Sequence, residues 1–333
     1  MQETVLPGHG SGGKLMSELI HKVIKETLDS GGLQLDDSAV LPVDGTNIVF
    51  TTDSYTITPI FFPGGNIGDL AVNGTVNDLA VMGATPRYLS CGLILEEGLP
   101  LEELKAVLQA MRAAADKAGV KIVTGDTKVV EKGKGDKIFI NTAGIGVLTQ
   151  PLQRRAIEVG DKIIVNGTLG DHGIAVMAER NGLSFTEGLK TDCAPLNLLL
   201  QPLMEAFPGK IRFIRDATRG GAASVLNEIV EGQPFSVRLI EEDIPVKDEV
   251  QGVCDILGIE PLYAANEGKL VMVADATVAD AIVQKMRELP FGNDAAVIGE
   301  VTGEFDGVVF VQTPVGGRRM LPLLTEDQLP RIC

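Results

Sequence analysis

The sequence predicts a two-domain α+β protein, and three observations lead to that fold class. The chain has 333 residues, more than one hydrophobic core usually serves, and 44% of them are hydrophobic. Segments with strand character lie between segments whose apolar residues recur at helical spacing. Both halves also follow one order: a short strand, a glycine-rich helix, a strand, an amphipathic helix and a strand. We interpret the halves as two related α+β units, on pattern alone.

The first half carries its predicted elements in regular succession. The apolar run that ends at Asp53 has strand character, whereas the segment after Gly64-Gly65 has helical spacing. That helix carries unusually short polar side chains, which indicates that a ligand or another element packs closely against it. The predicted helices cover residues 15–24, 66–82 and 101–117, and the predicted strands cover residues 47–52, 87–95, 120–124 and 137–148.

The second half follows a predicted domain junction at residues 150–160. Its strands are predicted at residues 161–166, 211–214, 235–239, 269–274, 295–301 and 308–312. One helix is predicted to end at Arg180, and the others cover residues 195–206, 222–231, 248–257 and 278–288. The chain from Arg318 onward is predicted to leave this unit as a tail.

Composition limits the class of partner. The formal net charge of -16 argues against nucleic acid, whose recognition needs Lys and Arg clustered on one face. An acidic protein still binds an anionic nucleotide when divalent cations bridge its carboxylates to the phosphates. The sequence has no signal segment at its start and no apolar run long enough to span a bilayer. We therefore expect a soluble, cytoplasmic protein without a membrane partner.

Cysteine placement points to the C-terminus. Cys91, Cys193 and Cys254 lie far apart without a C-x-x-C pair, which fits neither a zinc site nor a disulfide framework, and we interpret them as buried thiols. Cys333 ends the chain, and the neighbouring Arg331 favours its nucleophilic thiolate form. Nothing in the sequence anchors this tail. A carrier role for the thiol and a chance ending both remain open at this point.

A glycine loop precedes the first helix. Residues 8–13 lead to Lys14, and such a loop can turn backbone N–H groups toward a phosphate while the lysine adds positive charge. The spacing is not that of a P-loop. A phosphate-binding loop and a flexible linker are both compatible with this stretch.

Aspartates recur in one context. Each lies at or near the predicted end of a strand or on the glycine-rich helix. Carboxylates gathered from several segments repel one another unless cations neutralise them, and hard oxygen ligands select Mg²⁺ shared with nucleotide phosphates. A helix-capping or turn role remains the alternative for any single position. The recurring residues are Asp36, Asp37, Asp53, Asp78, Asp126 and Asp216.

These motifs together resemble a known superfamily over nearly the whole chain. The pattern resembles the aminoimidazole ribonucleotide synthetase (PurM-like) superfamily of ATP-dependent enzymes. Within it, the ending Pro330-Arg331-Ile332-Cys333 is similar to that of the hydrogenase-maturation carbamoyl dehydratases. The motifs that carry the resemblance are His9-Gly10-Ser11-Gly12-Gly13-Lys14, Asp36-Asp37-Ser38-Ala39-Val40, Thr52-Asp53, Asn77-Asp78-Leu79-Ala80-Val81-Met82-Gly83, Gly125-Asp126-Thr127-Lys128 and Arg215-Asp216-Ala217-Thr218-Arg219-Gly220-Gly221.

The resemblance implies a domain organisation. Residues 1–40 would form a glycine-rich loop and helix, and residues 41–150 an ATP-binding domain that forms a dimeric β-barrel with the same domain of a second copy. Residues 151–317 would form a C-terminal α+β sandwich domain, and residues 318–333 a flexible tail that ends in the reactive cysteine. The protein would be a homodimer.

The resemblance also implies an activity. A carbamoyltransferase maturation factor (HypF) would load a carbamoyl group on the Cys333 thiol, and this protein would dehydrate it to a thiocyanate with ATP and Mg²⁺. The cyano group would pass to an iron-carrying HypC–HypD complex and become a cyanide ligand of [NiFe]-hydrogenase.

The resemblance assigns roles to individual residues, and an ordinary ion-pair role stays open for Lys128 and Glu267. The catalytic set is Cys333, Lys128 and Glu267. The predicted ATP-binding set is Lys14, Asp37, Asp53, Asn77, Asp78, Gly125, Asp126, Asp216, Thr218, Arg219 and Gly220. The predicted Mg²⁺ ligands are Asp36, Asp37, Asp78 and Asp216.

Two rival functions remain on the sequence. Selenophosphate synthetase shares most of these motifs, but it would place a reactive cysteine or selenocysteine beside the N-terminal glycine loop, and here the first cysteine is Cys91. A nucleotide-gated carrier would present a thiol-bound group without transforming it. The carrier predicts ATP binding without ATP consumption.

Overall fold

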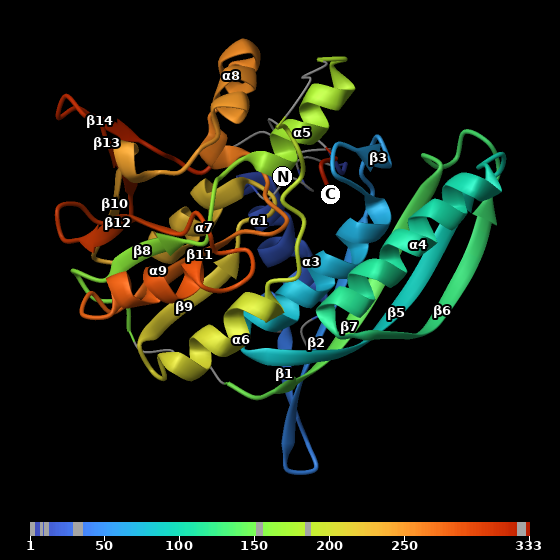
Figure 1. Cartoon of the computed structure of the whole chain (residues 1–333), viewed down its shortest axis with the longest axis horizontal. Helices are drawn as coiled ribbons and strands as arrows, with labels where there is room; N and C mark the ends of the chain where they lie inside the picture. The colour runs from blue at the N-terminus through green and yellow to red at the C-terminus, as the bar shows by residue number, and fades with distance from the viewer. Residues whose placement is uncertain are drawn as a thin grey trace.

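The computed structural model describes residues 4–6, 9, 13–28, 36–150, 156–183, 188–324 and 331–333. Within these residues, two main sheets carry helices on their faces (Figure 1). The structure therefore confirms the predicted two-domain α+β fold. The dimeric barrel stays a prediction.

The N-terminal domain is built on a five-stranded sheet in the order β1-β2-β7-β5-β6. β5 and β6 are parallel, and the other neighbours are antiparallel. Two helices, α3 and α4, pack on one face, and a short β3–β4 hairpin leads into α3. The bounds are β1 (Ala39–Val43), β2 (Thr46–Tyr55), β3 (Phe61–Phe62), β4 (Gly65–Asn66), α3 (Ile67–Val81), β5 (Ala84–Glu96), α4 (Leu101–Ala118), β6 (Lys121–Val130) and β7 (Ile138–Leu148).

The opposite face of this sheet carries exposed apolar side chains, and no described helix packs on it. Along β2, Val49 and Tyr55 are buried on the side of α3, whereas Phe50 points to the other side and is exposed. Phe50 pairs with Ile145, and Ile145 pairs with Tyr88, so the three side chains share the outer face. No described part of the chain covers it.

The C-terminal domain is built on a seven-stranded sheet in the order β14-β13-β10-β12-β8-β11-β9. α9 packs on one face together with α6, and α7 contacts β10, β11 and β13. The strands are β8 (Lys162–Val165), β9 (Ile211–Asp216), β10 (Ser236–Ile240), β11 (Leu270–Ala274), β12 (Ala296–Thr302), β13 (Val309–Gln312) and β14 (Arg318–Met320). The helices are α5 (Asp171–Arg180), α6 (Asn197–Ala206), α7 (Gly221–Val230), η3 (Glu241–Asp243), α8 (Asp248–Leu257), η4 (Pro261–Tyr263) and α9 (Ala279–Arg287).

Helix α3 connects the two domains. It packs on β2, β5 and β7 and also contacts α6 and β9 of the C-terminal domain. It is buried along nearly its whole length, because both of its sides face protein. A side-chain carbon at Gly74 would overlap the Tyr55 hydroxyl, so the helix lies very close to β2. The prediction of close packing against this helix is confirmed.

Several boundaries differ from the predicted ones. β2 continues to Tyr55 and β6 continues to Val130, so Asp53 and Asp126 lie inside strands and not beyond their ends. β1, the β3–β4 hairpin and β14 were not predicted, and β14 places Arg318–Met320 in the C-terminal sheet, although the tail was expected to begin there. Short or edge strands escape periodicity analysis because they contain too few alternating residues.

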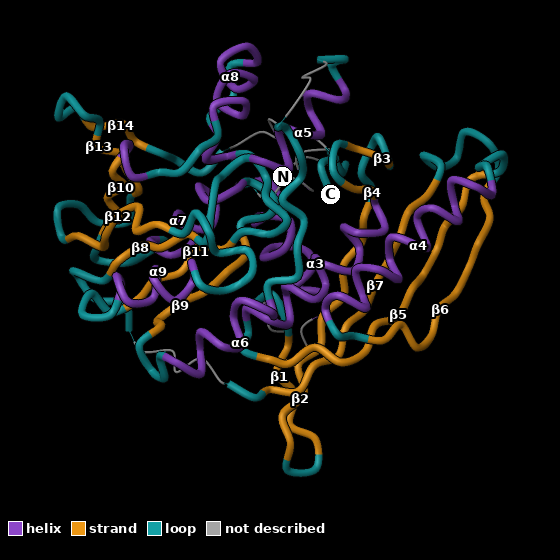
Figure 2. Tube along the Cα trace, viewed as in Figure 1, coloured by secondary structure: helices purple, strands orange, loops and turns teal. Residues whose placement is uncertain are grey.

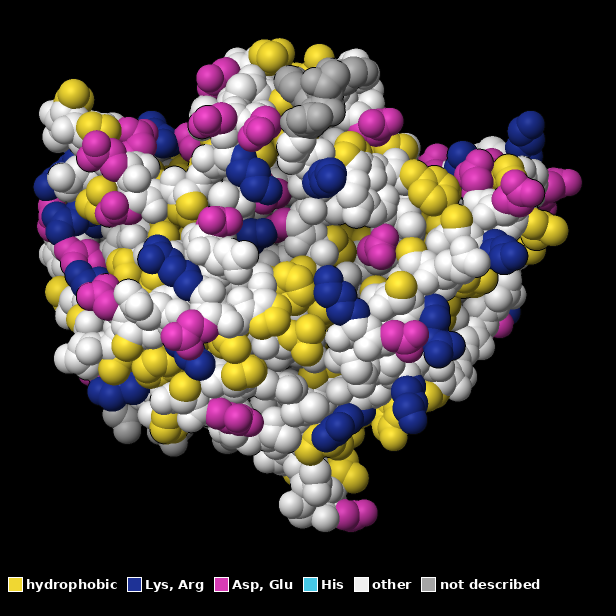
Figure 3. Space-filling view, viewed as in Figure 1, with side chains coloured by type: hydrophobic (Ala, Val, Ile, Leu, Met, Phe, Trp, Pro, Cys, Tyr) yellow, Lys and Arg dark blue, Asp and Glu magenta, His cyan; other side chains and the backbone are white. Residues whose placement is uncertain are grey.

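The first predicted helix is split into three parts, α1 (Lys14–Leu19), a π-helical segment η2 (Ile20–Lys25) and α2 (Glu26–Leu28). Most of the predicted glycine loop and part of the predicted domain junction lie outside the described residues. Among the described helices, none has both the length and the apolarity needed to cross a membrane. On the face shown in Figure 3, acidic and basic side chains are interspersed.

Candidate functional site

Carboxylates from four separate segments meet where the two domains join. Thr51 Oγ1 on β2 donates to the Asp78 carboxylate on α3 at 2.8 Å and lies 2.9 Å from the Asp37 carbonyl oxygen. Asp37 in turn pairs with Arg215 near the end of β9, with 3.0 Å between Arg215 Nε and a carboxylate oxygen. Asp216 follows directly as the last residue of β9 and is buried. Four of the predicted site residues therefore form one cluster: Asp37, Asp53, Asp78 and Asp216.

These carboxylates disfavour one another's charge. Burial raises the pKa of Asp216 to about 8, and the charges of Asp37 and Asp53 add to the effect. Burial, Asp216 and Asp53 likewise raise the pKa of Asp78 well above its usual value. The protein alone therefore supplies too little positive charge to neutralise these carboxylates. A bound cation would reduce the repulsion between them.

A basic residue offsets part of this charge. The Arg215 guanidinium also approaches Asp36, at 3.9 Å, and pairs with Glu228. Within the described residues, no three carboxylate, histidine or cysteine side chains are arranged to hold a metal ion. Two predicted Mg²⁺ ligands, Asp36 and Asp37, pair with Arg215 instead.

Glu267 lies beside this cluster and is 2% exposed. Its backbone N–H donates to Asp192 Oδ1 at 3.0 Å, whereas no donor in the described part of the chain reaches its Oε1. Burial raises the pKa of Glu267 well above its usual value, and the charges of Asp216 and Asp192 raise it further. A buried carboxyl oxygen without a bonding partner is rare, and together with the raised pKa it marks a candidate catalytic group.

Asn77, predicted to bind the nucleotide, joins the domains. Its Nδ2 donates to the carbonyl oxygens of Ala194, at 3.1 Å, and Glu267, at 3.0 Å, and its Oδ1 accepts from the Leu196 N–H at 2.8 Å. The side-chain amide is therefore used within the chain. Its action on the site is to fix the backbone of Glu267.

The last three residues are docked in the site. The Thr56 N–H donates to the Cys333 carbonyl oxygen at 3.2 Å, and Arg331 donates to the Thr56 carbonyl oxygen at 2.8 Å. Arg331 also pairs with Asp136, and Ile332 is 3% exposed. The C-terminus accordingly lies beside α5 and the β3–β4 hairpin (Figures 1 and 2).

Helix α5 supplies a further anchor for the tail. His172 Nε2 donates to the Ile332 carbonyl oxygen at 2.9 Å, while its Nδ1 accepts from the Thr191 hydroxyl at 2.8 Å. Arg180 donates to the Arg331 carbonyl oxygen. The expectation that nothing anchors the tail is therefore wrong for residues 331–333, because it considered only the tail's own sequence and not its partners.

The N-terminus of α7 brings Thr218, Arg219 and Gly220 next to Asp216. Gly220 and Gly221 have φ of +76° and +61°, a backbone region that favours glycine, and they turn the chain sharply from β9 into α7. Helix N-termini attract anions. The charge of Cys333 is the first cause that raises the pKa of Arg219, so the docked terminus and Arg219 lie close together.

Asp126 and Lys128 do not join the cluster within one chain. They pair with each other at 2.6 Å on the edge strand β6, and their side chains are 71% and 68% exposed. Asp126 pairs with Gly92, Gly92 pairs with Asn141, and Asn141 pairs with Ser54, next to Asp53. Three strand spacings amount to roughly 14 Å. Both side chains lie on the outer face of the sheet, with Phe50.

Two further predicted residues have structural surroundings. A side-chain carbon at Gly125 would overlap the Cys91 carbonyl oxygen, so this glycine lets β6 approach β5. Lys14 is exposed at the start of α1, and its backbone N–H donates to the Leu324 carbonyl oxygen at 3.1 Å. Of the three cysteines expected to be buried, Cys254 is buried, whereas Cys91 and Cys193 are only partly so.

Sequence reasoning missed residues that surround the site. His172, Thr191 and Asp192 anchor the tail and the Glu267 backbone, and Asn73 lies one helical turn before Asn77. The only available signal was the cluster of short polar residues on the helix that carries Asn73 and Asn77.

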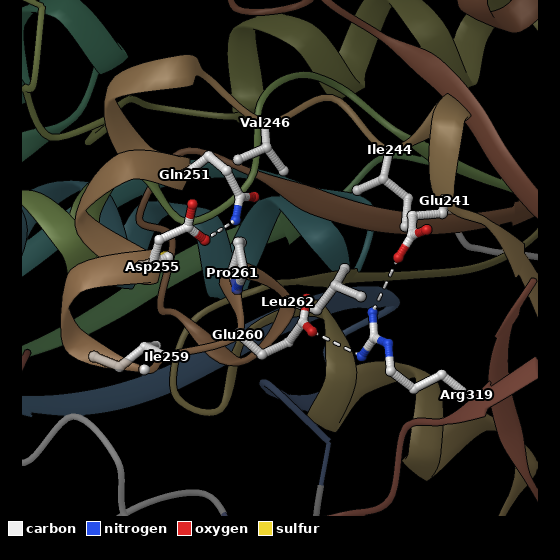
Figure 4. Close-up of a pocket in the computed structure, with 12 residues that line it drawn as sticks. Glu241, Ile244, Val246, Gln251, Asp255, Ile259, Glu260, Pro261, Leu262 and Arg319 are labelled. Atoms are coloured by element: carbon white, nitrogen blue, oxygen red, sulfur yellow. Dashed lines mark hydrogen bonds and ion pairs between the residues drawn. The ribbon is translucent and has the colours of Figure 1, made fainter. Parts of the chain in front are cut away.

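A cavity of about 480 Å³ lies elsewhere in the C-terminal domain, between η3, α8, η4 and β14 (Figure 4). Arg319 reaches across it to Glu260, at 2.7 Å, and to Glu241, at 3.6 Å. Gln251 donates to Asp255 at 2.7 Å. These polar groups satisfy one another, and none of the cluster carboxylates lines the cavity.

Two family models match the chain. They are the AIR synthase related protein N-terminal domain, over residues 35–148, and the corresponding C-terminal domain, over residues 158–312. The carbamoyl dehydratase HypE of Azotobacter vinelandii is 44% identical over 328 residues, which cover 98% of this chain and 96% of that protein. The chain belongs to the HypE family of carbamoyl dehydratases. This confirms the resemblance drawn from the motifs.

Solved structures of the HypE family share the fold. The structure of a HypE–HypF complex matches with a TM-score of 0.85 at 43% identity, covering 92% of this chain and 99% of that one. A HypE structure in complex with ATP matches with a TM-score of 0.82 at 44% identity, covering 99% and 100%. Both matches span the N-terminal and the C-terminal domain.

The carboxylate cluster predicts a stability that depends on pH. A raised carboxyl pKa stabilises the folded state at low pH, and this contribution is lost as pH rises through the folded pKa, here about 8 for Asp216. In chelator, the melting temperature should therefore fall between about pH 5 and 8, with about 1.4 kcal/mol lost per unit of displaced pKa. Asp216→Asn should make the fall smaller, and Mg²⁺ should restore stability at the alkaline end if the cluster binds it.

The matched control for that measurement is Asp116→Asn, which removes the same charge from an exposed ion pair with Arg112. It should leave the pH profile of the wild type unchanged. A wild-type melting temperature that is flat over this range would contradict the electrostatic account of the cluster.

Proposed function

We propose that the protein dehydrates a carbamoyl group carried on the Cys333 thiol to a thiocyanate, at the expense of ATP, and so supplies cyanide ligands for the iron of [NiFe]-hydrogenase. The observation that supports this most directly is the docked terminus. Cys333 lies within electrostatic reach of Arg219, and Arg219 of the buried Glu267. Membership of the HypE family of carbamoyl dehydratases supports the same reaction.

The reaction needs an activated oxygen and two proton acceptors. The carbonyl oxygen of the thiocarbamate attacks the γ-phosphorus of ATP, ADP leaves, and the amide nitrogen loses one proton. Phosphate then departs with that oxygen while the nitrogen loses its second proton, which leaves S–C≡N. Phosphoryl transfer depends on positioning and charge neutralisation more than on covalent catalysis. In this proposal Arg219 stabilises the developing charge and Glu267 accepts a proton.

The nucleotide is proposed to bind where the carboxylate cluster meets the N-terminus of α7. A HypE structure in complex with ATP supports ATP as the ligand. The mutual repulsion of the carboxylates supports Mg²⁺, with Asp36, Asp37, Asp78 and Asp216 as ligands once the ion displaces Arg215 from Asp37. The direct contacts are proposed for Lys14, Asp37, Asp53, Asp78, Asp216, Thr218, Arg219 and Gly220, and supporting roles for Asn77, Gly125 and Asp126.

A homodimer would bring Lys128 to a reacting tail. The outer face of the N-terminal sheet carries exposed apolar side chains together with Asp126 and Lys128. Pairing this face with that of a second copy would close a β-barrel, as predicted from the family resemblance, and bury Phe50 and Tyr88. We propose that Lys128 then acts on the site of the neighbouring subunit.

The proposed partners follow the same reaction. HypF would load the carbamoyl group, and a HypE–HypF complex has been solved for a relative. A HypC–HypD complex would receive the cyano group. The four cysteines are free thiols, which supports the cytoplasm as the location.

The test is conversion of the loaded terminus. Cyanate in its protonated form, isocyanic acid, adds to a thiol. It therefore places –C(=O)NH2 on Cys333 without a partner protein. After addition of Mg²⁺ and ATP, mass spectrometry of the C-terminal peptide should show loss of one water, with ADP and phosphate in matching amount. A non-hydrolysable ATP analogue should give no loss. Binding of ATP without any loss of water would replace the enzyme by a carrier.

A further inference from the structure

Asn73 carries a buried acceptor that no described residue uses. It lies on α3 one turn before Asn77 and is 4% exposed. Its Nδ2 donates to Cys193 Sγ at 3.3 Å, but no described residue donates to its Oδ1, which is closed off from solvent. Buried acceptors are nearly always bonded in folded proteins, so this one is open to a donor that a bound group supplies.

A second unused acceptor lies in the same place. Glu267 Oε1 is also buried without a donor among the described residues. The charge of Glu267 is the second cause, after burial, that raises the pKa of the Cys193 thiol, the group that Asn73 contacts. Both side chains therefore lie near Cys193, Asn73 through its hydrogen bond to the thiol and Glu267 through the bond of its backbone to the adjacent Asp192.

Two sets of interactions connect the docked tail with the region around Cys193 and Glu267. Ile332 bonds to His172, His172 to Thr191, and the Thr191 hydroxyl accepts from the Cys193 N–H at 3.1 Å. Through charge, Cys333 acts on Arg219, and Arg219 acts on Glu267. The docked end of the chain therefore lies in the same region of the site as Asn73 and Glu267.

We propose that Asn73 Oδ1 accepts a hydrogen bond from the carbamoyl NH2 group, beside Glu267, and makes the site specific for a primary amide. This rests on the proposed dehydration. An NH2 group offers two N–H bonds, and the reaction must remove both protons, so one acceptor orients the nitrogen while the other takes a proton. An acyl group without N–H would leave Asn73 Oδ1 unpaired and would be rejected for that reason.

The decisive variant is Asn73→Leu, which keeps the branching of the side chain and removes both polar atoms. Removing an unpaired buried acceptor from a helix should leave the melting temperature equal to that of the wild type or higher. Loading of Cys333 and ATP binding should be unchanged, whereas dehydration of the loaded tail should slow by roughly 10- to 100-fold.

The matched control is Cys193→Ala, which removes the partner of Asn73 Nδ2 and leaves Oδ1 in place. It should dehydrate the tail within about threefold of the wild-type rate. If Asn73 acts only by bonding to Cys193, the two variants will lose activity equally, and that result would overturn the proposal.

A direct readout of the contact is hydrogen exchange of the carbamoyl NH2, observed by NMR after loading with isotope-labelled cyanate and without ATP. Exchange should be slow in the wild type and in Cys193→Ala, and at least about tenfold faster in Asn73→Leu. Unchanged exchange in Asn73→Leu, or a clear drop in its melting temperature, would assign Asn73 to packing. Should the wild type show slow exchange but no ATP-dependent loss of water, the proposed dehydration fails while the amide contact stands.

Discussion

Glu267→Gln should accept the carbamoyl group and bind ATP like the wild type, yet dehydrate the tail about 10²- to 10⁴-fold more slowly. A neutral amide of the same shape cannot take a proton from nitrogen. Glu267 Oε1 has no bonding partner in the described residues, so the substitution breaks no hydrogen bond to that oxygen and should disturb the fold little. Quenched-flow analysis of the C-terminal peptide measures the single-turnover rate.

The pH dependence gives an independent check on Glu267. Burial and the charges of Asp216 and Asp192 raise the pKa of Glu267, which favours the protonated carboxyl, the form that cannot act as a base. Cations at the aspartate cluster would lower the pKa of Glu267. With Mg²⁺-ATP, the wild-type dehydration rate should therefore rise as the pH passes through this lowered pKa. The rise should vanish in Glu267→Gln. A variant that dehydrates at the wild-type rate would move the base to Lys128, another carboxylate or water.

The sequence predicted most helices and strands well, because the helical and the strand spacing of apolar residues can each be recognised within one short segment. The spacing over residues 66–82 defined a buried helix that the structure places at Ile67–Val81, and the acid after residues 211–214 does lie at the end of a strand, as Asp216. Local rules suffice where a segment buries one face and ends at a glycine or a charged turn.

The arrangement of the site depends on contacts between residues far apart in the chain and on strand order, which the spacing of residues within one segment does not predict. The docking of Cys333 needs His172 and Thr56, which lie far from it in the chain. The position of Lys128 follows from strand order, since β6 is an edge strand and the lysine points to the outer face. Asn77 was assigned to the nucleotide from its motif, whereas its contacts show that it joins the domains.

Cys333→Ala should lose the reaction completely while binding ATP normally, because it removes the sulfur to which the carbamoyl group bonds and leaves the cluster carboxylates in place. Calorimetry measures ATP binding, and labelled cyanate followed by digestion measures loading of the C-terminal peptide. Label that remains on this peptide in the variant would show an acceptor other than the thiol. ATP-dependent loss of water in the variant would move the reacting group to Cys91, Cys193 or Cys254.

Mixing two inactive variants decides whether Lys128 acts across a dimer. Lys128→Ala should be inactive if the lysine takes part, and its side chain is exposed, so the fold should persist. In a mixed dimer with Cys333→Ala, the one intact tail would meet the intact Lys128 of the other subunit. Statistical exchange should then restore about a quarter of the wild-type activity, since half of the dimers are mixed and each holds one complete site. If Lys128 serves its own chain, no site is complete and the mixture stays inactive.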